Sequence, residues 1–285
     1  MAAAANLMSQ ASLGPFMDET VPGAPVPIVG SARRIANHYY SHADWSPPRI
    51  AAGVRAARGL LPSNGTETRR YRNKMALLTI QPGSVGRNTY TWKCRNCTLR
   101  HDDARCTVGC YFAFRAARFD VAASKLEIRQ TNNIGPNAGP AAAGAPPQYG
   151  IFVRAGQRIL RHEWLGEYIG ELLDPSHPGS LDGSYSFNLD RGDFGLLPPL
   201  EIDSVRRGNW TRFVNHRCDP NVELVTTQAG KIRMLCFRAR QNIEAGQEIF
   251  IHYGRPYFTS RSMACQCDYQ GVPHAPTLAM AKVRI

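Results

Sequence analysis

Seven short stretches with strand-like composition, separated by turns, follow one another between residues 148 and 254. In one-letter code they read YGIFVRA, GEYIGELL, SYSFNLD, LEIDS, NVELVTT, KIRMLCFRAR and EIFIHYG. Short runs rich in β-branched and aromatic residues and bounded by turn residues are typical of strands. Within this half, only residues 211–215 have a pattern that favours a helix. We therefore predict a mostly β domain built of short strands.

Basic charge is concentrated in the first half of the chain. Residues 1–147 carry 18 Lys and Arg against 8 Asp and Glu, whereas residues 148–285 carry 16 against 14. Local clusters lie at Arg33–Arg34, Arg69–Arg70, Arg72 and Lys74. Such a region suits a polyanion such as nucleic acid, and a solvated basic surface is the alternative. The sequence has no long apolar run and no secretory signal pattern, so we expect a soluble intracellular protein without a membrane partner.

For the other segments we predict only the local structure. Residues 1–30, rich in Ala, Gly and Pro, are expected to lack fixed structure, and so is the low-complexity insertion at 135–147. Residues 32–40 could form one short helix, and residues 75–80 a strand or a buried turn. Apolar spacing predicts a helix over 111–121, and alternation predicts a strand over 125–130.

Four of the eight cysteines are closely spaced, in the pattern Cys94-x2-Cys97-x8-Cys106-x3-Cys110. Close cysteine pairs of this kind bind zinc tetrahedrally, and a loop-rich segment gains folding free energy from the metal. Without a secretory signal, zinc fits these spacings better than disulfides do, and reduced buried cysteines are the alternative. Cys236 lies in an apolar stretch and is predicted to be a core residue.

Residues 212–221, RFVNHRCDPN, place an Arg, two Asn, a His and a Cys beside a helix-breaking Pro. Loops dense in such groups are often binding or catalytic sites. Turn-capping Asn and Asp with a buried His would give the same pattern for structural reasons, and the residues alone favour neither interpretation.

The RFVNHRCDPN segment resembles the signature segment of SET-domain lysine methyltransferases. Together with the preceding residues RGNWT, it most resembles the heterochromatin branch that methylates lysine 9 of histone H3. GEYIGELL, YSFNLD, IDSVRRGNWTRFVNHRCDPN, NIEAGQEIFIHYG and CQC also resemble family blocks, in the family's order, over about residues 125–267. The resemblance implies a SET fold of small curved β-sheets with a pseudoknot, in which the RFVNHRCDPN and IHYG segments meet at the active site. The composition marks residues 1–74 as a basic, partly disordered region. The resemblance implies a cysteine-rich pre-SET-like zinc module at 75–124, a SET domain at 125–254 and a post-SET region at 255–285.

The resemblance also implies roles for individual residues. It assigns catalysis to Tyr253 and Tyr185, the substrate channel to Ile251 and Phe258, and binding of S-adenosylmethionine (SAM) to Tyr149, Gly150, Arg212, Phe213, Asn215 and His216. The sequence departs from the family at Gln148, where a Gly is usual, and at His252, where an Asp is usual. Ile251 replaces a frequent aromatic residue, which predicts di- or trimethylation.

A second zinc site is implied at Cys218, Cys265 and Cys267. The last cysteine of the family's C-x-C-x4-C motif is Val272 here, so we expect His274 to replace it. An empty site, or one completed by water, is the alternative. The first cysteine set, with four cysteines, is smaller than the cluster typical of the branch that methylates lysine 9 of histone H3.

The function implied is SAM-dependent methylation of a histone tail, with histone H3 lysine 9 as the first choice. The expected partners are a histone tail or nucleosome, with nucleic-acid contact through the basic half, and the expected location is nuclear chromatin. A catalytically inactive SET-fold chromatin module and a methyltransferase of a non-histone protein are the alternatives. We expect the basic clusters of residues 1–74 to hold the protein on nucleosomes.

The chemistry of methyl transfer explains why such an active site needs apolar and tyrosine side chains. A lysine amine must be neutral to attack a sulfonium methyl, which costs roughly 4.6 kcal/mol at pH 7 for an unperturbed side chain. A narrow apolar channel and the nearby sulfonium charge both lower this cost. No strong base is then required, so Tyr253 is expected to align the amine rather than to accept its proton.

Overall fold

The structure is a computed structural model that describes residues 33–34, 39–40, 93–100, 103–131, 148–173, 185–189, 200–262, 264–265 and 267. The helical elements are α4 (Gly109–Phe114), the π-helix η2 (Arg115–Asp120), α5 (Val121–Ala123), the 3₁₀-helix η3 (Trp210–Phe213) and α6 (Arg255–Thr259). The strands are β1 (Arg33–Arg34), β2 (Tyr39–Tyr40), β3 (Leu126–Gln130), β4 (Tyr149–Val153), β5 (Trp164–Glu167), β6 (Glu171–Leu173), β7 (Ser186–Asn188), β8 (Glu201–Asp203), β9 (Arg207–Gly208), β10 (Asn215–His216), β11 (Val222–Ala229), β12 (Ile232–Ala239) and β13 (Phe250–Ile251).

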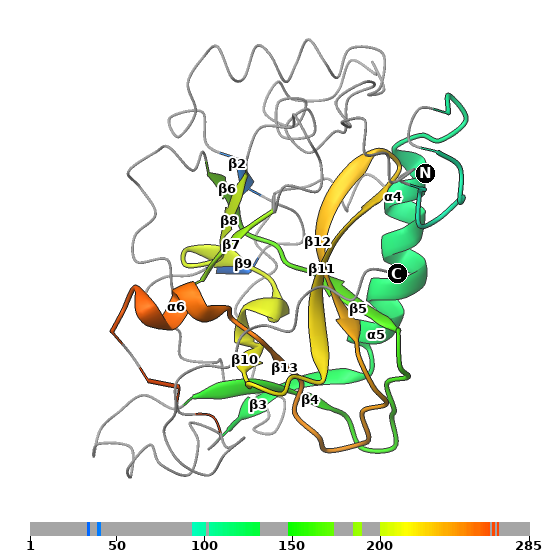
Figure 1. The fold of residues 1–285 in the computed structure, drawn as a ribbon. Coiled ribbons are helices and arrows are strands. Elements are labelled where there is room, and N and C mark those ends of the chain that lie inside the picture. Colours follow the sequence, from blue (N-terminus) through cyan, green and yellow to red (C-terminus); the bar gives the residue numbers. More distant parts are fainter. Residues whose placement is uncertain are drawn as a thin grey trace.

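The described strands form small sheets rather than one large one. Their orders are β11-β12-β5, β2-β6-β8-β7, and the pairs β1-β9, β3-β4 and β10-β13. Each predicted strand-like stretch of the second half contains at least one of these strands. The prediction of a mostly β fold of small sheets is confirmed (Figure 1).

The hairpin of β11 and β12 is the longest regular feature. Its register is unbroken from Val222 opposite Ala239 to Ala229 opposite Ile232. The two turn residues, Gly230 and Lys231, both have positive φ angles, +56° and +65°. Two-residue turns with positive φ at both positions follow the right-handed twist of the strands, which explains how so tight a turn joins them.

A continuous helical segment, α4 through η2 to α5, lies alongside this hairpin and β5 (Figure 1). Its buried residues Tyr111, Phe114 and Phe119 share one core with the strands. The helix expected at 111–121 and the strand expected at 125–130 are both confirmed. Cys236 is fully buried in this core, as predicted, and burial raises the pKa of its thiol well above the usual value.

The helical segment is tied to β5 by a buried polar contact. The Tyr111 hydroxyl donates a 3.0 Å hydrogen bond to Oε2 of Glu167. Nη1 of Arg115 lies 3.3 Å from the same carboxylate oxygen and donates to the Tyr111 hydroxyl. The cysteine-rich segment therefore packs as part of the β domain's core.

The expectation of a helix at residues 32–40 is wrong. β1 pairs in parallel with β9, and β2 pairs in parallel with β6. A helix this short is marginal in water, and the strand partners lie more than 130 residues away, where local sequence cannot reveal them. The expectations for residues 1–30, 75–80 and 135–147 lie outside the described residues. None of the described helices is long and apolar enough to span a membrane.

The pairing of β10 with β13 positions the candidate site. It is parallel, with Asn215 opposite Phe250 and His216 opposite Ile251. The RFVNHRCDPN and IHYG segments therefore meet, as the sequence implied. Immediately before β10, the predicted helical turn is present as η3, whose first turn is capped by Asn209 through a hydrogen bond accepted from the backbone N–H of Thr211.

Candidate active site and metal centres

Tyr253 follows β13 and is held at both of its ends. Its hydroxyl donates a 2.9 Å hydrogen bond to the backbone carbonyl of Val214, and its backbone N–H donates to Nδ1 of His216 at 3.1 Å. Desolvation, with smaller contributions from neighbouring tyrosines, raises the pKa of Tyr253 well above its usual value. The hydroxyl is therefore a neutral group whose proton points at Val214 and whose lone pairs are turned elsewhere.

Aromatic rings surround Tyr253. Phe187 on β7 and Tyr257 on α6 lie with ring centroids 6.5 Å and 4.7 Å from it, and both contacts are edge-on. Phe258, a predicted channel residue, is buried on α6 next to Tyr257. Phe187 and Tyr257 are absent from the predicted site, although Phe187 lies in the quoted block YSFNLD and Tyr257 follows the block that ends at Gly254. An aromatic residue two positions after Tyr185, on the same side of a strand, was a usable signal.

Tyr185 lies under the guanidinium of Arg212. The Arg212 carbon Cζ is 4.7 Å from the centroid of the Tyr185 ring, and Arg212 donates to the backbone carbonyls of Ser204 and Val205. The backbone carbonyl of Tyr185 accepts a hydrogen bond from the hydroxyl of Tyr168. Burial lowers the pKa of Arg212, and the guanidinium stays a buried cation held by carbonyls and the π face of Tyr185. The structure thus brings together Tyr185, which the resemblance assigns to catalysis, and Arg212, which it assigns to SAM binding.

Glu248 is a functional candidate that the sequence interpretation missed. Its Oε1 accepts a 2.8 Å hydrogen bond from Nδ2 of Asn215, and its Oε2 accepts a 2.9 Å bond from the hydroxyl of Thr131. Asn215 Nδ2 also donates to the carbonyl of Tyr149 at 3.1 Å. The sequence signal for it was a Glu at the edge of the apolar stretch IFI, and the structure shows that this carboxylate is buried. Glu248 fixes the orientation of the Asn215 amide.

Gly150 leaves room for the carboxylate of Glu248 beside the β4 backbone. A Cβ at this position would lie 2.2 Å from Oε1 of Glu248 and 2.7 Å from its carboxyl carbon. The close approach of the β4 backbone to the Glu248–Asn215 pair therefore depends on the missing side chain.

The six residues assigned to SAM come from three segments that the fold brings close. β4 carries Tyr149 and Gly150 and packs against η3, which carries Arg212 and Phe213. Asn215 then links β10 to the start of β4. An oriented amide, a glycine backbone and aromatic rings are groups that suit an adenine ring and a sulfonium, so the residues fit the cofactor. Ile251, assigned to the channel, is fully buried in the main core.

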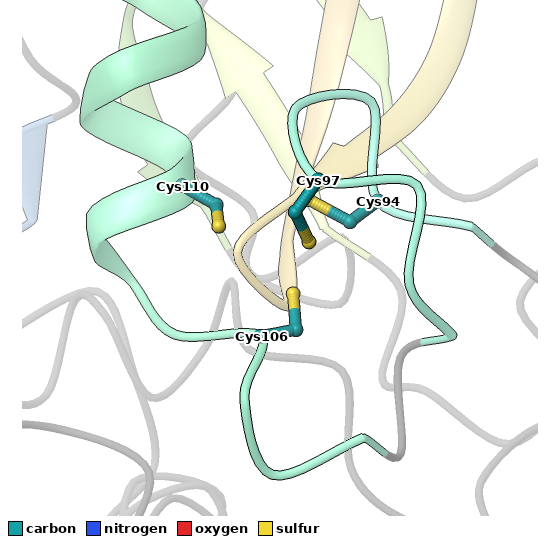
Figure 2. Close-up of side chains that lie close together, drawn as sticks. All are labelled: Cys94, Cys97, Cys106 and Cys110. Carbon is teal, nitrogen blue, oxygen red and sulfur yellow. The ribbon is translucent and has the colours of Figure 1, made fainter.

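The first cysteine set forms a compact cluster. The sulfur atoms of Cys94, Cys97, Cys106 and Cys110 all lie within 4.8 Å of one another. Figure 2 shows three of them on the loop before α4 and Cys110 at the start of that helix. All eight cysteines of the chain lie among the described residues, and none forms a disulfide. The arrangement fits a tetrahedral zinc ion.

The environment of this cluster favours thiolates bound to a cation. Burial opposes ionisation of Cys94, but hydrogen bonds from the backbone N–H groups of Cys97, Gly230 and Asn96 outweigh it and lower the pKa of Cys94 to about 7. Burial and the neighbouring Cys94 raise the pKa of Cys106. A divalent cation among the four sulfurs would remove this mutual repulsion. Through Gly230, the tip of the β11–β12 hairpin supports the cluster.

A second cluster contains His216, Cys218, Cys265 and Cys267, whose ligand atoms also lie within 4.8 Å of one another. The sulfurs of Cys218 and Cys265 are 3.6 Å apart. The three predicted cysteines are therefore brought together. His274, predicted as the fourth ligand, lies outside the described residues. His216, which the sequence assigned to SAM, is the histidine that the structure places in this cluster.

Part of this chain is similar to known proteins. The family model for the SET domain matches residues 150–254. The chain is 33% identical over 138 residues to the histone-lysine N-methyltransferase SUVR5 of Arabidopsis thaliana, covering 41% of this chain and 10% of that protein. It is 29% identical over 128 residues to an H3 lysine-36 specific histone-lysine N-methyltransferase of Emericella nidulans, covering 41% of this chain and 12% of that protein.

Among solved structures, the complex of KRYPTONITE with mCHH DNA, an H3(1-15) peptide and SAH aligns over 45% of this chain and 23% of that one, with a TM-score of 0.33 and 22% identity. The matched part is about a tenth of each of the two curated relatives. Residues 150–254 of this chain therefore match the model of the SET domain, and this part of the chain is similar to proteins named histone-lysine N-methyltransferases.

Proposed function

We propose that this protein transfers a methyl group from SAM to a lysine side chain of a histone tail. The observation that carries the proposal is the Tyr253 hydroxyl, fixed on the Val214 carbonyl inside a ring of aromatic side chains. The relatives named histone-lysine N-methyltransferases support the same chemistry.

SAM, when bound, supplies the methyl group as part of a sulfonium. The protein's own residues then bring a neutral amine into line with it. Phe187, Tyr257 and Tyr253 provide apolar walls that disfavour a charged ammonium. Because the Tyr253 proton is held by Val214, the oxygen presents lone pairs, which accept N–H bonds from the incoming amine and leave the amine's own lone pair directed at the methyl.

The cofactor side of the site would be built by Asn215 and Gly150. Glu248 accepts a hydrogen bond from the amide nitrogen of Asn215, and this bond fixes the orientation of the amide. Gly150 lets the β4 backbone reach the same place. Tyr149, Arg212, Phe213 and His216 complete the proposed set, with His216 contributing through its backbone on β10.

The substrate proposed first is the tail of histone H3, with lysine 9 as the target. The signature segment resembles the lysine 9 branch, whereas one of the relatives is named as specific for lysine 36. The target lysine is therefore the first variable to separate by experiment. Nuclear chromatin is the proposed location. One structural zinc ion at each cysteine cluster is proposed as well, on the strength of the sulfur geometry.

The test is transfer of labelled methyl from SAM to recombinant nucleosomes, free histones and H3 tail peptides. Peptides with lysine 9 or lysine 36 replaced by arginine identify the target. Label on H3 that is lost with Tyr253→Phe supports the proposal. If label is lost only from the lysine-36 variant peptide, the choice of lysine 9 is wrong. No label on any histone, from chain that binds SAM in calorimetry, would favour the inactive module or a non-histone substrate.

Nucleosome retention by the basic N-terminal region needs a refined test. Deleting residues 1–74 would also remove β1 and β2, which pair with strands of the SET region. Neutralising Arg69, Arg70, Arg72 and Lys74 to Gln leaves both strands in place. We expect this variant to bind nucleosomes more weakly and to methylate a free peptide at the unchanged rate. An equal loss of methylation on nucleosomes and on the free peptide would contradict a role of these residues in nucleosome binding.

A further inference from the structure

The imidazole of His216 lies between the catalytic tyrosine and the C-terminal cysteine cluster. Its Nδ1 accepts the backbone N–H of Tyr253 at 3.1 Å, and its Nε2 lies 3.4 Å from the sulfur of Cys218. The ring also packs against Phe258 and His252, with centroid distances of 4.7 Å and 4.8 Å. One side chain therefore contacts two parts of the site that have different functions.

The hydrogen bonds fix which ring nitrogen carries the proton. A backbone N–H can only donate, so Nδ1 faces Tyr253 with its lone pair. In a neutral imidazole the proton is then on Nε2, which points at the sulfur of Cys218. A nitrogen that carries a proton has no lone pair for a metal. His216 thus lies among the potential ligands but is arranged as a hydrogen-bond donor to one of them.

Other donors surround the same sulfurs. The backbone N–H of Cys218 donates to Cys267 Sγ at 3.4 Å, and that of Cys267 donates to Cys265 Sγ at 3.5 Å. Hydrogen bonds from N–H groups stabilise thiolates, the form in which cysteine binds metals. The cluster is therefore prepared to hold a soft divalent cation by three sulfurs, with His216 supporting Cys218.

We propose that His216 is a positioning residue that couples this metal cluster to Tyr253 without ligating the metal. A metal held by Cys218, Cys265 and Cys267 fixes the Cys218 sulfur, which orients the imidazole through Nε2–H. The imidazole then holds the backbone of Tyr253 through Nδ1, so that the hydroxyl stays on Val214. The kinetic part of the proposal rests on the proposed methyltransferase function, whereas the tautomer and the metal stoichiometry do not.

The tautomer and the ligand set are measured without any assay of activity. ¹⁵N-histidine NMR of the zinc-loaded full chain separates protonated, unprotonated and metal-bound ring nitrogens, and His216→Asn identifies the signals of residue 216. We expect an unprotonated Nδ1 and a protonated Nε2. By elemental analysis, His216→Asn should keep the wild-type zinc content while Cys265→Ser loses one ion. A metal-bound Nε2, or loss of one zinc ion from His216→Asn, would overturn the proposal.

Two matched substitutions separate the two hydrogen bonds. In His216→Asn, the amide oxygen Oδ1 lies roughly where the histidine Nδ1 was and can still accept the Tyr253 N–H. In His216→Gln, the amide nitrogen Nε2 lies roughly where the histidine Nε2 was and can still donate to Cys218, but no acceptor remains for Tyr253. Losing the bond to Tyr253 leaves a partly buried N–H unpaired, so His216→Gln should have a kcat about fivefold below that of His216→Asn. SAM affinity, measured by calorimetry, should be equal in the two variants. Equal kcat values, or a faster Gln variant, would contradict the coupling.

Discussion

The hydroxyl of Tyr253 donates a 2.9 Å hydrogen bond to the backbone carbonyl of Val214, which lies immediately before β10. The bond joins the two segments that the parallel pairing of β10 with β13 brings side by side. It also commits the only proton of the hydroxyl, so the oxygen can accept further hydrogen bonds but cannot donate one.

Removing this oxygen should abolish most of the activity while preserving the fold. For Tyr253→Phe we expect kcat to fall by roughly 100-fold or more, because the amine loses the group that orients it. The SAM dissociation constant should stay within about twofold, since the proposed cofactor contacts lie on β4, η3 and β10. Initial rates on an H3 peptide and calorimetric titration with SAM measure the two effects. A variant that loses SAM binding in parallel with kcat would show that Tyr253 has a different role.

The pH dependence should follow the substrate rather than Tyr253. Burial raises the pKa of Tyr253 well above its ordinary value near 10, so the protonated hydroxyl persists to higher pH than a free tyrosine would allow. Activity that needs this proton is present below the raised pKa and is lost only above it. We expect kcat/KM to rise with pH between about 7 and 9, as more substrate lysine becomes neutral. A decline of the wild-type rate within that range, with the protein still folded, would show that a group other than the substrate lysine controls the rate.

The first cysteine cluster should be required for zinc and for stability. Cys106→Ser is expected to lose one zinc ion per chain and to lower the melting temperature by several degrees, because three ligands hold the metal less tightly and the loop before α4 depends on it. Elemental analysis and thermal unfolding measure both quantities. Cys236→Ala is the matched control, since Cys236 is buried in the core and belongs to neither cluster. The Cys236→Ala variant should keep all of its zinc, and its free energy of unfolding should fall by about 1 kcal/mol.

Gly150 should be essential for SAM binding for a steric reason. In Gly150→Ala the new methyl group would displace the Glu248 carboxylate that orients Asn215, so we expect at least about tenfold weaker SAM binding. Gly156→Ala is the comparison, because its methyl group meets no atom within 4 Å while its φ of +70° still strains an alanine. That variant should lose about 1 kcal/mol of stability and none of its SAM affinity. If both variants bind SAM normally, the proposed cofactor site is misplaced.

The product of the reaction is predicted from Ile251. An aliphatic side chain offers the amine no hydrogen bond that would hold it after one transfer, so we expect di- and trimethylated peptide on prolonged incubation. Mass spectrometry of an H3 peptide at increasing times gives the distribution. Ile251 is fully buried in the main core, so its influence would come through the shape of the channel wall. Accumulation of monomethyl peptide alone would contradict the prediction.

Local sequence was sufficient for the elements whose causes are local. The alternation in 125–130, the helical spacing in 111–121 and the short strand-like stretches after residue 148 all correspond to observed elements. The spacing of Cys94, Cys97, Cys106 and Cys110 likewise indicated one cluster, because a short segment can bring such ligands together at a small cost in loop-closure entropy. The resemblance of RFVNHRCDPN and its companions assigns Tyr253, Tyr185 and Asn215 to the site, and this assignment stays a prediction.

Only the tertiary structure decided the contacts between distant segments. Residues 32–40 are predicted as a helix from their own composition, yet they supply β1 and β2 because strands from residue 171 onward offer them hydrogen-bonding partners. Glu248 matters because Asn215, Thr131 and Gly150 converge on it from three other parts of the chain. The family resemblance assigns His216 to the cofactor, whereas its side chain lies between Tyr253 and Cys218. The sequence determined which chemical groups are present. The folded chain determined which of them meet, because hydrogen bonds and van der Waals contacts act only over a few ångströms.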